Sequence, residues 1–155
     1  MIVDDAGTRS RLATALHVAR WVDEVAAGCP YPSVDSLVGV ADLAARTLTP
    51  AEVDEALAAH PRIGEKAGGL SRSEQAASAT DDPELVAAMT AGNRAYEERF
   101  GRIFLIRAAG RSRPEILAEL RRRLTLSDAA EAAEVADQLR QIALLRLRTL
   151  FEETP

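Results

Sequence analysis

Arg146 is a cation placed where a helical protein would ordinarily bury an apolar side chain. At about 100° per residue, it falls in the middle of an arc formed by Val135, Leu139, Ile142 and Leu150. An arginine on an apolar stripe needs an anionic or carbonyl partner, because an unpaired buried charge is costly. The position therefore indicates a substrate-binding cation, a structural ion pair, or an arginine that snorkels near a helix end.

His60 is the second candidate for chemistry. It lies seven residues after Val53 and three after Leu57, so it extends the inward face of the helix predicted there. Pro61 follows at once and discourages further helix. An imidazole at a helix C-terminus interacts with the negative end of the dipole, which favours its protonated form near neutral pH. His60 is thus either a proton shuttle or a core histidine that donates one hydrogen bond to a carbonyl.

Glu74 is a carboxylate whose spacing also has a purely structural explanation. Ser71 and Glu74 have the spacing of a capping box, in which the glutamate reaches back to the backbone amide of the serine. Spacing alone therefore assigns Glu74 to a helix start and to no other task.

The chain that must position these groups has 155 residues, enough to form one hydrophobic core. Its composition, 47% apolar and 28% charged, excludes a disordered or fibrous chain. With 19 basic and 24 acidic residues the net charge is −5, which disfavours nucleic acid as a partner. We therefore predict a single domain over residues 1–155.

The same sequence predicts a cytoplasmic protein that does not enter a membrane. No apolar run approaches the roughly 18 residues of a membrane span, and the first residues lack the pattern of a signal peptide. Cys29 is the only cysteine, and the two histidines, His17 and His60, lie far apart in sequence. We therefore expect no internal disulfide and no bound metal.

Helix start signals recur along the chain. Thr49-Pro50 and Ser112-Arg113-Pro114 each precede a glutamate at capping-box spacing, and Ser33 and Asp82-Pro83 open two further segments. An apolar stripe from Leu12 to Ala26 predicts one early helix, and residues 127–151 form the last. The run Ile103-Phe104-Leu105-Ile106 breaks this pattern. The sequence thus predicts an all-α, compact helical bundle with one short irregular or extended segment near 103–106.

Several motifs together resemble the 2-oxo-4-hydroxy-4-carboxy-5-ureidoimidazoline (OHCU) decarboxylases. They follow the order of that family between Trp21 and Leu150 and comprise Ala59-His60-Pro61-Arg62-Ile63-Gly64, Ser71-Arg72-Ser73-Glu74-Gln75, Asn93-Arg94-Ala95-Tyr96-Glu97-Glu98-Arg99-Phe100-Gly101, Ile103-Phe104-Leu105-Ile106, Gly110-Arg111-Ser112 and Leu144-Leu145-Arg146-Leu147. Each motif is weak alone, whereas their common order is specific.

The resemblance implies an all-helical, homodimeric carboxy-lyase of urate breakdown that converts OHCU to (S)-allantoin and CO2. It also implies that the enzyme needs no cofactor, because the substrate carries its own electron sink, a ring carbon–nitrogen double bond. Residues that match the family's site fall into two groups. The catalytic residues are His60 and Glu74, and the substrate-binding residues are Pro61, Ser71, Gln75, Arg146 and the backbone of Ile103, Phe104, Leu105 and Ile106.

Two alternatives remain open at this point. One is a non-catalytic helical interaction module, which would bind a partner chain through exposed helix faces and would have no pocket. The other is a related enzyme acting on a different ureido or imidazole compound, because fold-level resemblance does not fix the substrate.

Overall fold

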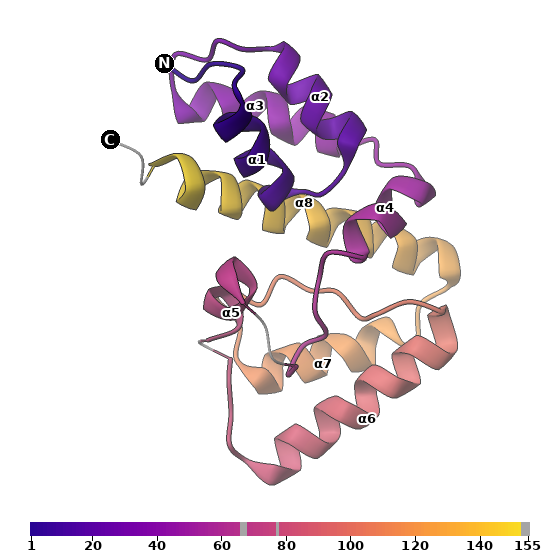
Figure 1. Cartoon of the computed structure of the whole chain (residues 1–155). Coiled ribbons are helices and arrows are strands. Elements are labelled where there is room, and N and C mark those ends of the chain that lie inside the picture. The colour runs from indigo at the N-terminus through magenta and orange to yellow at the C-terminus, as the bar shows by residue number, and fades with distance from the viewer. Residues whose placement is uncertain (66–67, 77, 153–155) are drawn as a thin grey trace. The chain divides into compact units, whose positions relative to one another are not determined.

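The chain forms two compact units of helices. The structure is a computed structural model that describes residues 1–65, 68–76 and 78–152. Unit 1 comprises Met1–Ala59 and Ala136–Pro155, and unit 2 comprises His60–Val135; each is described by itself. The helices of the described residues, coloured in chain order in Figure 1, are α1 (Ala6–Ala15), α2 (Ala19–Ala27), α3 (Val34–Ala45), α4 (Pro50–Leu57), α5 (Gly69–Ala76), α6 (Pro83–Phe100), α7 (Arg113–Arg123) and α8 (Asp128–Glu152).

The predicted all-α fold class is confirmed. Apart from an isolated antiparallel bridge between Ile2 and Tyr31, the described part of the chain contains no β-structure. Within these same residues, no helix is both long and apolar enough to cross a membrane.

The helix starts follow the predicted capping signals. The Thr49 hydroxyl accepts from the Glu52 amide at 3.2 Å, and the Glu52 carboxylate accepts from the Thr49 amide at 2.9 Å. Ser112 and Glu115 form the same reciprocal pair at the start of α7. Ser33 and Asp82 cap α3 and α6. Since these caps satisfy otherwise unpaired amides within one turn, they can be read from local sequence.

In unit 1, helices α2 and α3 pack around the buried Trp21, whose indole N–H donates to the carbonyl of Ala41 at 3.1 Å. The prediction of one helix from Leu12 to Ala26 is wrong. Helix α1 ends at Ala15 and α2 begins at Ala19, and the backbone is extended at Leu16 and Val18. Both of these side chains are buried, so the apolar pattern continues through the break between the two helices. Periodicity alone therefore cannot show where the first helix ends.

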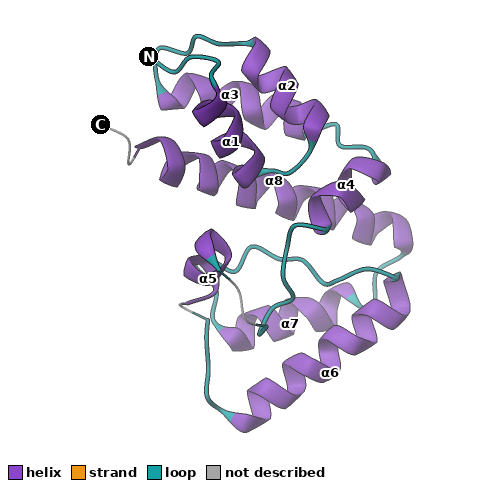
Figure 2. Ribbon diagram, viewed as in Figure 1, coloured by secondary structure: helices purple, strands orange, loops and turns teal. Residues whose placement is uncertain are grey.

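Unit 2 is built on the contact between α6 and α7. Gly92 of α6 lets α7 approach closely, because a Cβ there would lie 3.1 Å from the methyl groups of Leu120. The core of this unit consists of Ile63, Met89, Tyr96, Phe104, Ile106, Ala108, Ile116, Leu117 and Leu120. Figure 2 shows the connection between α6 and α7 as a loop, and residues 103–106 within it are irregular, as predicted.

Candidate functional site

His60 and Pro61 begin a loop that is anchored to α6. Both residues are half-buried and lie outside any helix. The prediction that His60 continues the inward face of the preceding helix is wrong, because α4 ends at Leu57 and its C-cap is Ala58. His60 therefore belongs to the loop that follows α4 and not to the helix itself.

Two polar contacts hold this loop. Arg62 donates from Nε and Nη2 to the Glu97 carboxylate, with a shortest distance of 2.6 Å, and this guanidinium lowers the pKa of the Glu97 carboxyl. The buried Asn93 amide donates to the Ile63 carbonyl at 3.0 Å. Asn93 and Glu97 are one turn apart on α6, so one helix face holds the loop at two consecutive residues, Arg62 and Ile63.

Helix α5 presents its predicted site residues on one face. Ser71, Glu74 and Gln75 are half-buried, whereas the intervening Arg72 and Ser73 are exposed. This is the pattern that spacings of three and four residues produce on a helix. The predicted capping box is wrong, because α5 begins at Gly69 and Ser71 is therefore its third residue.

The loop and α5 are joined at Gly64. Its N–H donates to the Gln75 side-chain oxygen at 3.1 Å, and its φ of +92° is one that L side chains rarely adopt. Gln75, a predicted substrate-binding residue, therefore also contributes to the position of the His60-Pro61 loop.

The segment from Ile103 to Ile106 is anchored through its side chains. Phe104 and Ile106 lie in the unit 2 core, and the Phe104 ring meets Tyr96 edge-on at a centroid distance of 5.2 Å. None of the four backbone N–H groups of this segment donates a hydrogen bond to a described residue. Because backbone donors seek partners, they are available to a ligand.

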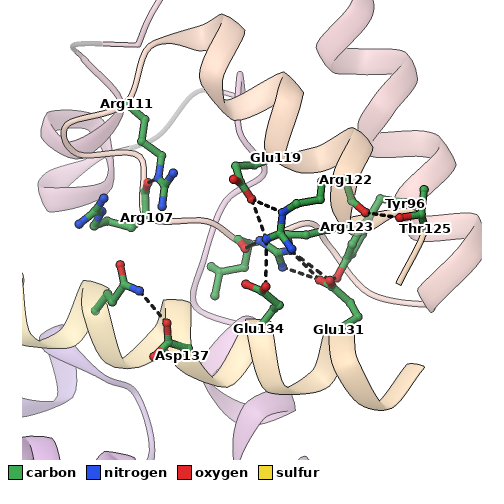
Figure 3. Close-up of polar contacts among 12 residues, drawn as sticks. Tyr96, Arg107, Arg111, Glu119, Arg122, Arg123, Thr125, Glu131, Glu134 and Asp137 are labelled. Carbon is green, nitrogen blue, oxygen red and sulfur yellow. Dashed lines mark hydrogen bonds and ion pairs between the residues drawn. The ribbon is translucent and has the colours of Figure 1, made fainter. Parts of the chain in front are cut away.

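A buried ion pair fixes the carbonyl side of the same segment (Figure 3). Arg123 of α7 and Glu131 of α8 are 1% and 0% exposed and approach to 2.5 Å. Arg123 also donates to the Leu105 carbonyl at 2.7 Å, and the Tyr96 hydroxyl donates to Glu131 at 2.5 Å. Burial, together with the adjacent Glu131 carboxylate, raises the pKa of Tyr96 to about 12.

Arg146 lies on the buried face of α8, as the arc predicts. Its side chain is 7% exposed, and Val135, Leu139 and Ile142 are buried as well. Its Nη1 donates to the Thr14 carbonyl at 3.0 Å, so one of its partners is a carbonyl of the kind expected for a buried arginine.

The predicted site residues divide between the two units. His60, Pro61, Ser71, Glu74, Gln75 and Ile103–Ile106 belong to unit 2, whereas Arg146 belongs to unit 1. A common site that includes Arg146 therefore stays a prediction. Among the described side chains, no group of three or more His, Cys, Asp or Glu residues is arranged to hold a metal ion.

Comparison with known proteins decides the family. The family model described as OHCU decarboxylase matches residues 3–148. A curated 2-oxo-4-hydroxy-4-carboxy-5-ureidoimidazoline decarboxylase from Haloferax volcanii is 31% identical over 136 residues, which cover 84% of this chain and 81% of that protein. The chain belongs to the OHCU decarboxylase family. The resemblance read from the motifs is thereby confirmed, and with it the enzyme class, a carboxy-lyase.

Solved structures of similar proteins share the OHCU decarboxylase fold. A crystal structure of an OHCU decarboxylase in the presence of (S)-allantoin superposes with a TM-score of 0.80 at 24% identity, covering 91% of this chain and 96% of that one. A crystal structure of (S)-allantoin synthase gives a TM-score of 0.66 at 20% identity, covering 92% of this chain and 49% of that one. At these identities the agreement concerns the fold.

The sequence analysis missed the buried ion pair that holds the predicted binding segment Ile103–Ile106. Arg123 lies seven residues after Ile116 and three after Leu120, and Glu131 lies four before Val135, so both occupy apolar helix faces. Opposite charges on the apolar faces of consecutive helices are a readable signal for a buried pair. Charged residues lie near both of them in the sequence, so Arg123 and Glu131 have the sequence context of solvent-exposed charges.

Proposed function

We propose that this protein converts OHCU to (S)-allantoin and CO2 as a step of urate breakdown, with residues 1–155 acting as one domain. The observation that carries the proposal is the family match over residues 3–148, together with the 31% identity to a protein of that name. The substrate is therefore a small ureidoimidazoline, and neither nucleic acid nor a membrane takes part.

The reaction needs an electron sink, a base and an acid. When the carbon–carbon bond to the carboxylate breaks, its electron pair moves into the ring carbon–nitrogen double bond of the substrate. The hydroxyl on the carbon that loses the carboxylate gives up its proton as the carbonyl of allantoin forms. A proton is then delivered to the adjacent ring carbon that bears the ureido group, and another to the ring nitrogen that received the electron pair, so that with the proton released by the hydroxyl one proton is consumed overall. Because delivery to one face sets the handedness of the product, the protein must orient the acid.

We assign the proton transfer to His60, with Glu74 as its partner. His60 is half-buried in a loop that the Arg62–Glu97 and Asn93–Ile63 contacts fix, which suits a group that must deliver a proton from one direction. Glu74 hydrogen-bonds His60 or the ureido group and thereby sets the imidazole tautomer. A carboxylate beside an imidazole raises its pKa.

We assign the remaining binding to Pro61, Ser71, Gln75, Arg146 and the backbone of residues 103–106. The N–H groups of that segment, which donate to no described residue, suit the carbonyl oxygens of the ring. Arg146 binds a ring or ureido oxygen that gains charge during the reaction. A grip on the departing carboxylate would instead stabilise the ground state more than the transition state.

We further propose that the enzyme is a homodimer, as the family resemblance implies, and that it is cytoplasmic, as the sequence pattern predicts. Sedimentation equilibrium of the purified chain tests the dimer, which predicts twice the mass of the 16.6 kDa monomer. A monomer at enzyme concentrations used for assay would contradict it.

The activity is tested by adding the purified protein to urate, urate oxidase and the hydrolase that follows it. We expect allantoin to appear faster than in the slow spontaneous decay of OHCU. A loss of about 10²- to 10⁴-fold in His60→Asn and Glu74→Gln is expected if both act in proton transfer. Equal rates with and without the wild-type protein would refute the proposed function.

A further inference from the structure

Unit 2 contains a cavity of about 1220 Å³ that shares only Gln75 with the residues assigned to the proposed reaction. Its wall is formed by residues 62–65 of the loop, one face of α5, the face of α6 from Val86 to Glu98, and Arg113 at the start of α7. Gln75 lines it, whereas His60, Ser71 and Glu74 are not among its lining residues. Apart from Gln75, the cavity wall is therefore made of residues that are not assigned to substrate binding.

Arg113 is the unusual member of this wall. Its side chain is 6% exposed, and it makes no hydrogen bond or ion pair with any residue of the described ranges. Burial alone lowers the pKa of its guanidinium. Its Nη1 lies against Gly64, 3.3 Å from where a Cβ would stand. A buried cation without a counter-charge is costly, so its retention needs a cause.

The charges around the cavity leave an excess of positive charge. Arg62 is neutralised by Glu97 and Glu65. Within the part of the chain that is described, three lining cations have no ion-pair partner: Arg72, Arg94 and Arg113. Among the lining carboxylates of the same part, Glu98 has no ion-pair partner. Arg72 and Arg94 are exposed, and so they stand at the mouth, whereas Arg113 is inside. Guanidinium groups bind carboxylate and phosphate oxygens with paired N–H donors.

The rest of the wall combines apolar side chains with the polar residues Gln75, Thr80, Thr90 and Asn93. Ile63 and Met89 are 6% and 2% exposed, and Val86 stands on the α6 side. An inorganic ion would leave this surface uncovered. Pockets for small molecules commonly combine such apolar walls with a few polar groups that fix orientation.

We propose that this cavity is a second ligand-binding site, which takes a small organic anion: a carboxylate or phosphate group carried on an apolar body. The anionic group binds Arg113, with Arg72 and Arg94 drawing it in from solvent, and the apolar body packs on Ile63, Met89 and Val86. Bound ligand would bridge α7 to the loop that begins at His60. The site is independent of the proposed reaction, because none of these six residues is assigned to catalysis.

The test uses the full chain and probes that differ in one property. Benzoate and phenyl phosphate carry an anion on an apolar ring, benzamide is the neutral counterpart of benzoate, and inorganic phosphate lacks the ring. We expect either aromatic anion, at about ten times its Kd, to raise the Tm by about 3–6 °C. In ¹H–¹⁵N spectra we expect shifts at Gly64, at residues 86–97 of α6, and at the Arg113 Nε–H.

Two variants complete the test. Arg113→Gln should weaken anion binding at least tenfold, whereas Arg121→Gln, an exposed arginine on the same helix, should bind like the wild type. If Arg113→Gln does not fold, the chemical-shift change of the Arg113 Nε–H in the wild type decides whether the anion binds at Arg113. Equal binding of benzamide and benzoate, anion binding that leaves the Arg113 Nε–H unmoved, or no binding of any probe would overturn the site. Inorganic phosphate binding as tightly as phenyl phosphate would overturn the assignment of an organic ligand.

Discussion

Replacing Glu131 by alanine removes the counter-charge of Arg123 at the centre of unit 2. Arg123 would keep its contacts with the Leu105 carbonyl and with the Phe104 ring face, 4.6 Å from its guanidinium carbon, but its Nε and Nη2 groups would lose the carboxylate that accepts their hydrogen bonds. The Tyr96 hydroxyl would lose its acceptor as well. Breaking a buried ion pair by removing one partner costs about 3–5 kcal/mol. For a chain of this length that corresponds to a fall in Tm of about 6–20 °C.

Urea unfolding followed by circular dichroism measures this loss in the free energy of unfolding. The matched control is Glu134→Ala, the same substitution one turn further along α8. Glu134 pairs with Arg122 at 2.9 Å, but the two side chains are 30% and 46% exposed. An exposed pair of this kind contributes about 0–1 kcal/mol.

A double variant separates the charge from the packing. Arg123→Met with Glu131→Leu replaces the pair by apolar side chains, and we expect it to recover most of the stability lost in Glu131→Ala. The Leu105 carbonyl would lose its Arg123 donor in this double variant, so kcat/KM should fall below the wild-type value. If Glu131→Ala destabilises the protein no more than Glu134→Ala, the reasoning about the buried pair is wrong.

Other perturbations test the remaining assignments. His60→Asn should lose about 10²- to 10⁴-fold in kcat while keeping the wild-type Tm, and a wild-type rate would remove His60 from the mechanism. Arg146→Leu should raise KM at nearly unchanged Tm, whereas marked unfolding would favour a structural role for its bond to the Thr14 carbonyl. Because the pKa of Tyr96 rises to about 12, its contribution to stability is complete below pH 10 and falls as the pH rises towards 12. Urea unfolding measures this effect. Between pH 9 and pH 11.5 the free energy of unfolding should fall less for Tyr96→Phe than for the wild type. Dialysis against a chelator should leave kcat unchanged, since the substrate supplies the electron sink, and activity restored only by added metal would contradict this.

Local signals explain which parts of the fold could be predicted. The reciprocal caps at Thr49 and Ser112 act within one turn, so their residue types and spacing suffice. The break between α1 and α2 could not be predicted in the same way. Leu16 and Val18 keep the apolar pattern while the backbone leaves the helix, and only packing in unit 1 makes both sides of the break buried.

Motif order predicted His60, Glu74 and the segment from Ile103 to Ile106 as site residues, but it could not predict the contacts around the His60-Pro61 loop and this segment, which are non-local. Arg62 reaches Glu97 across 35 residues, and Arg123 reaches the Leu105 carbonyl across 18. Such contacts depend on which helix faces meet, and periodicity along one helix does not determine that.

The enantiomeric composition of the product tests the central claim most directly. Circular dichroism can follow allantoin as it forms from urate, urate oxidase and the next hydrolase, with this protein present in catalytic amount. We predict a signal of pure (S)-allantoin that develops faster than spontaneous decay. A racemic product formed at the spontaneous rate would contradict stereospecific decarboxylation by this chain.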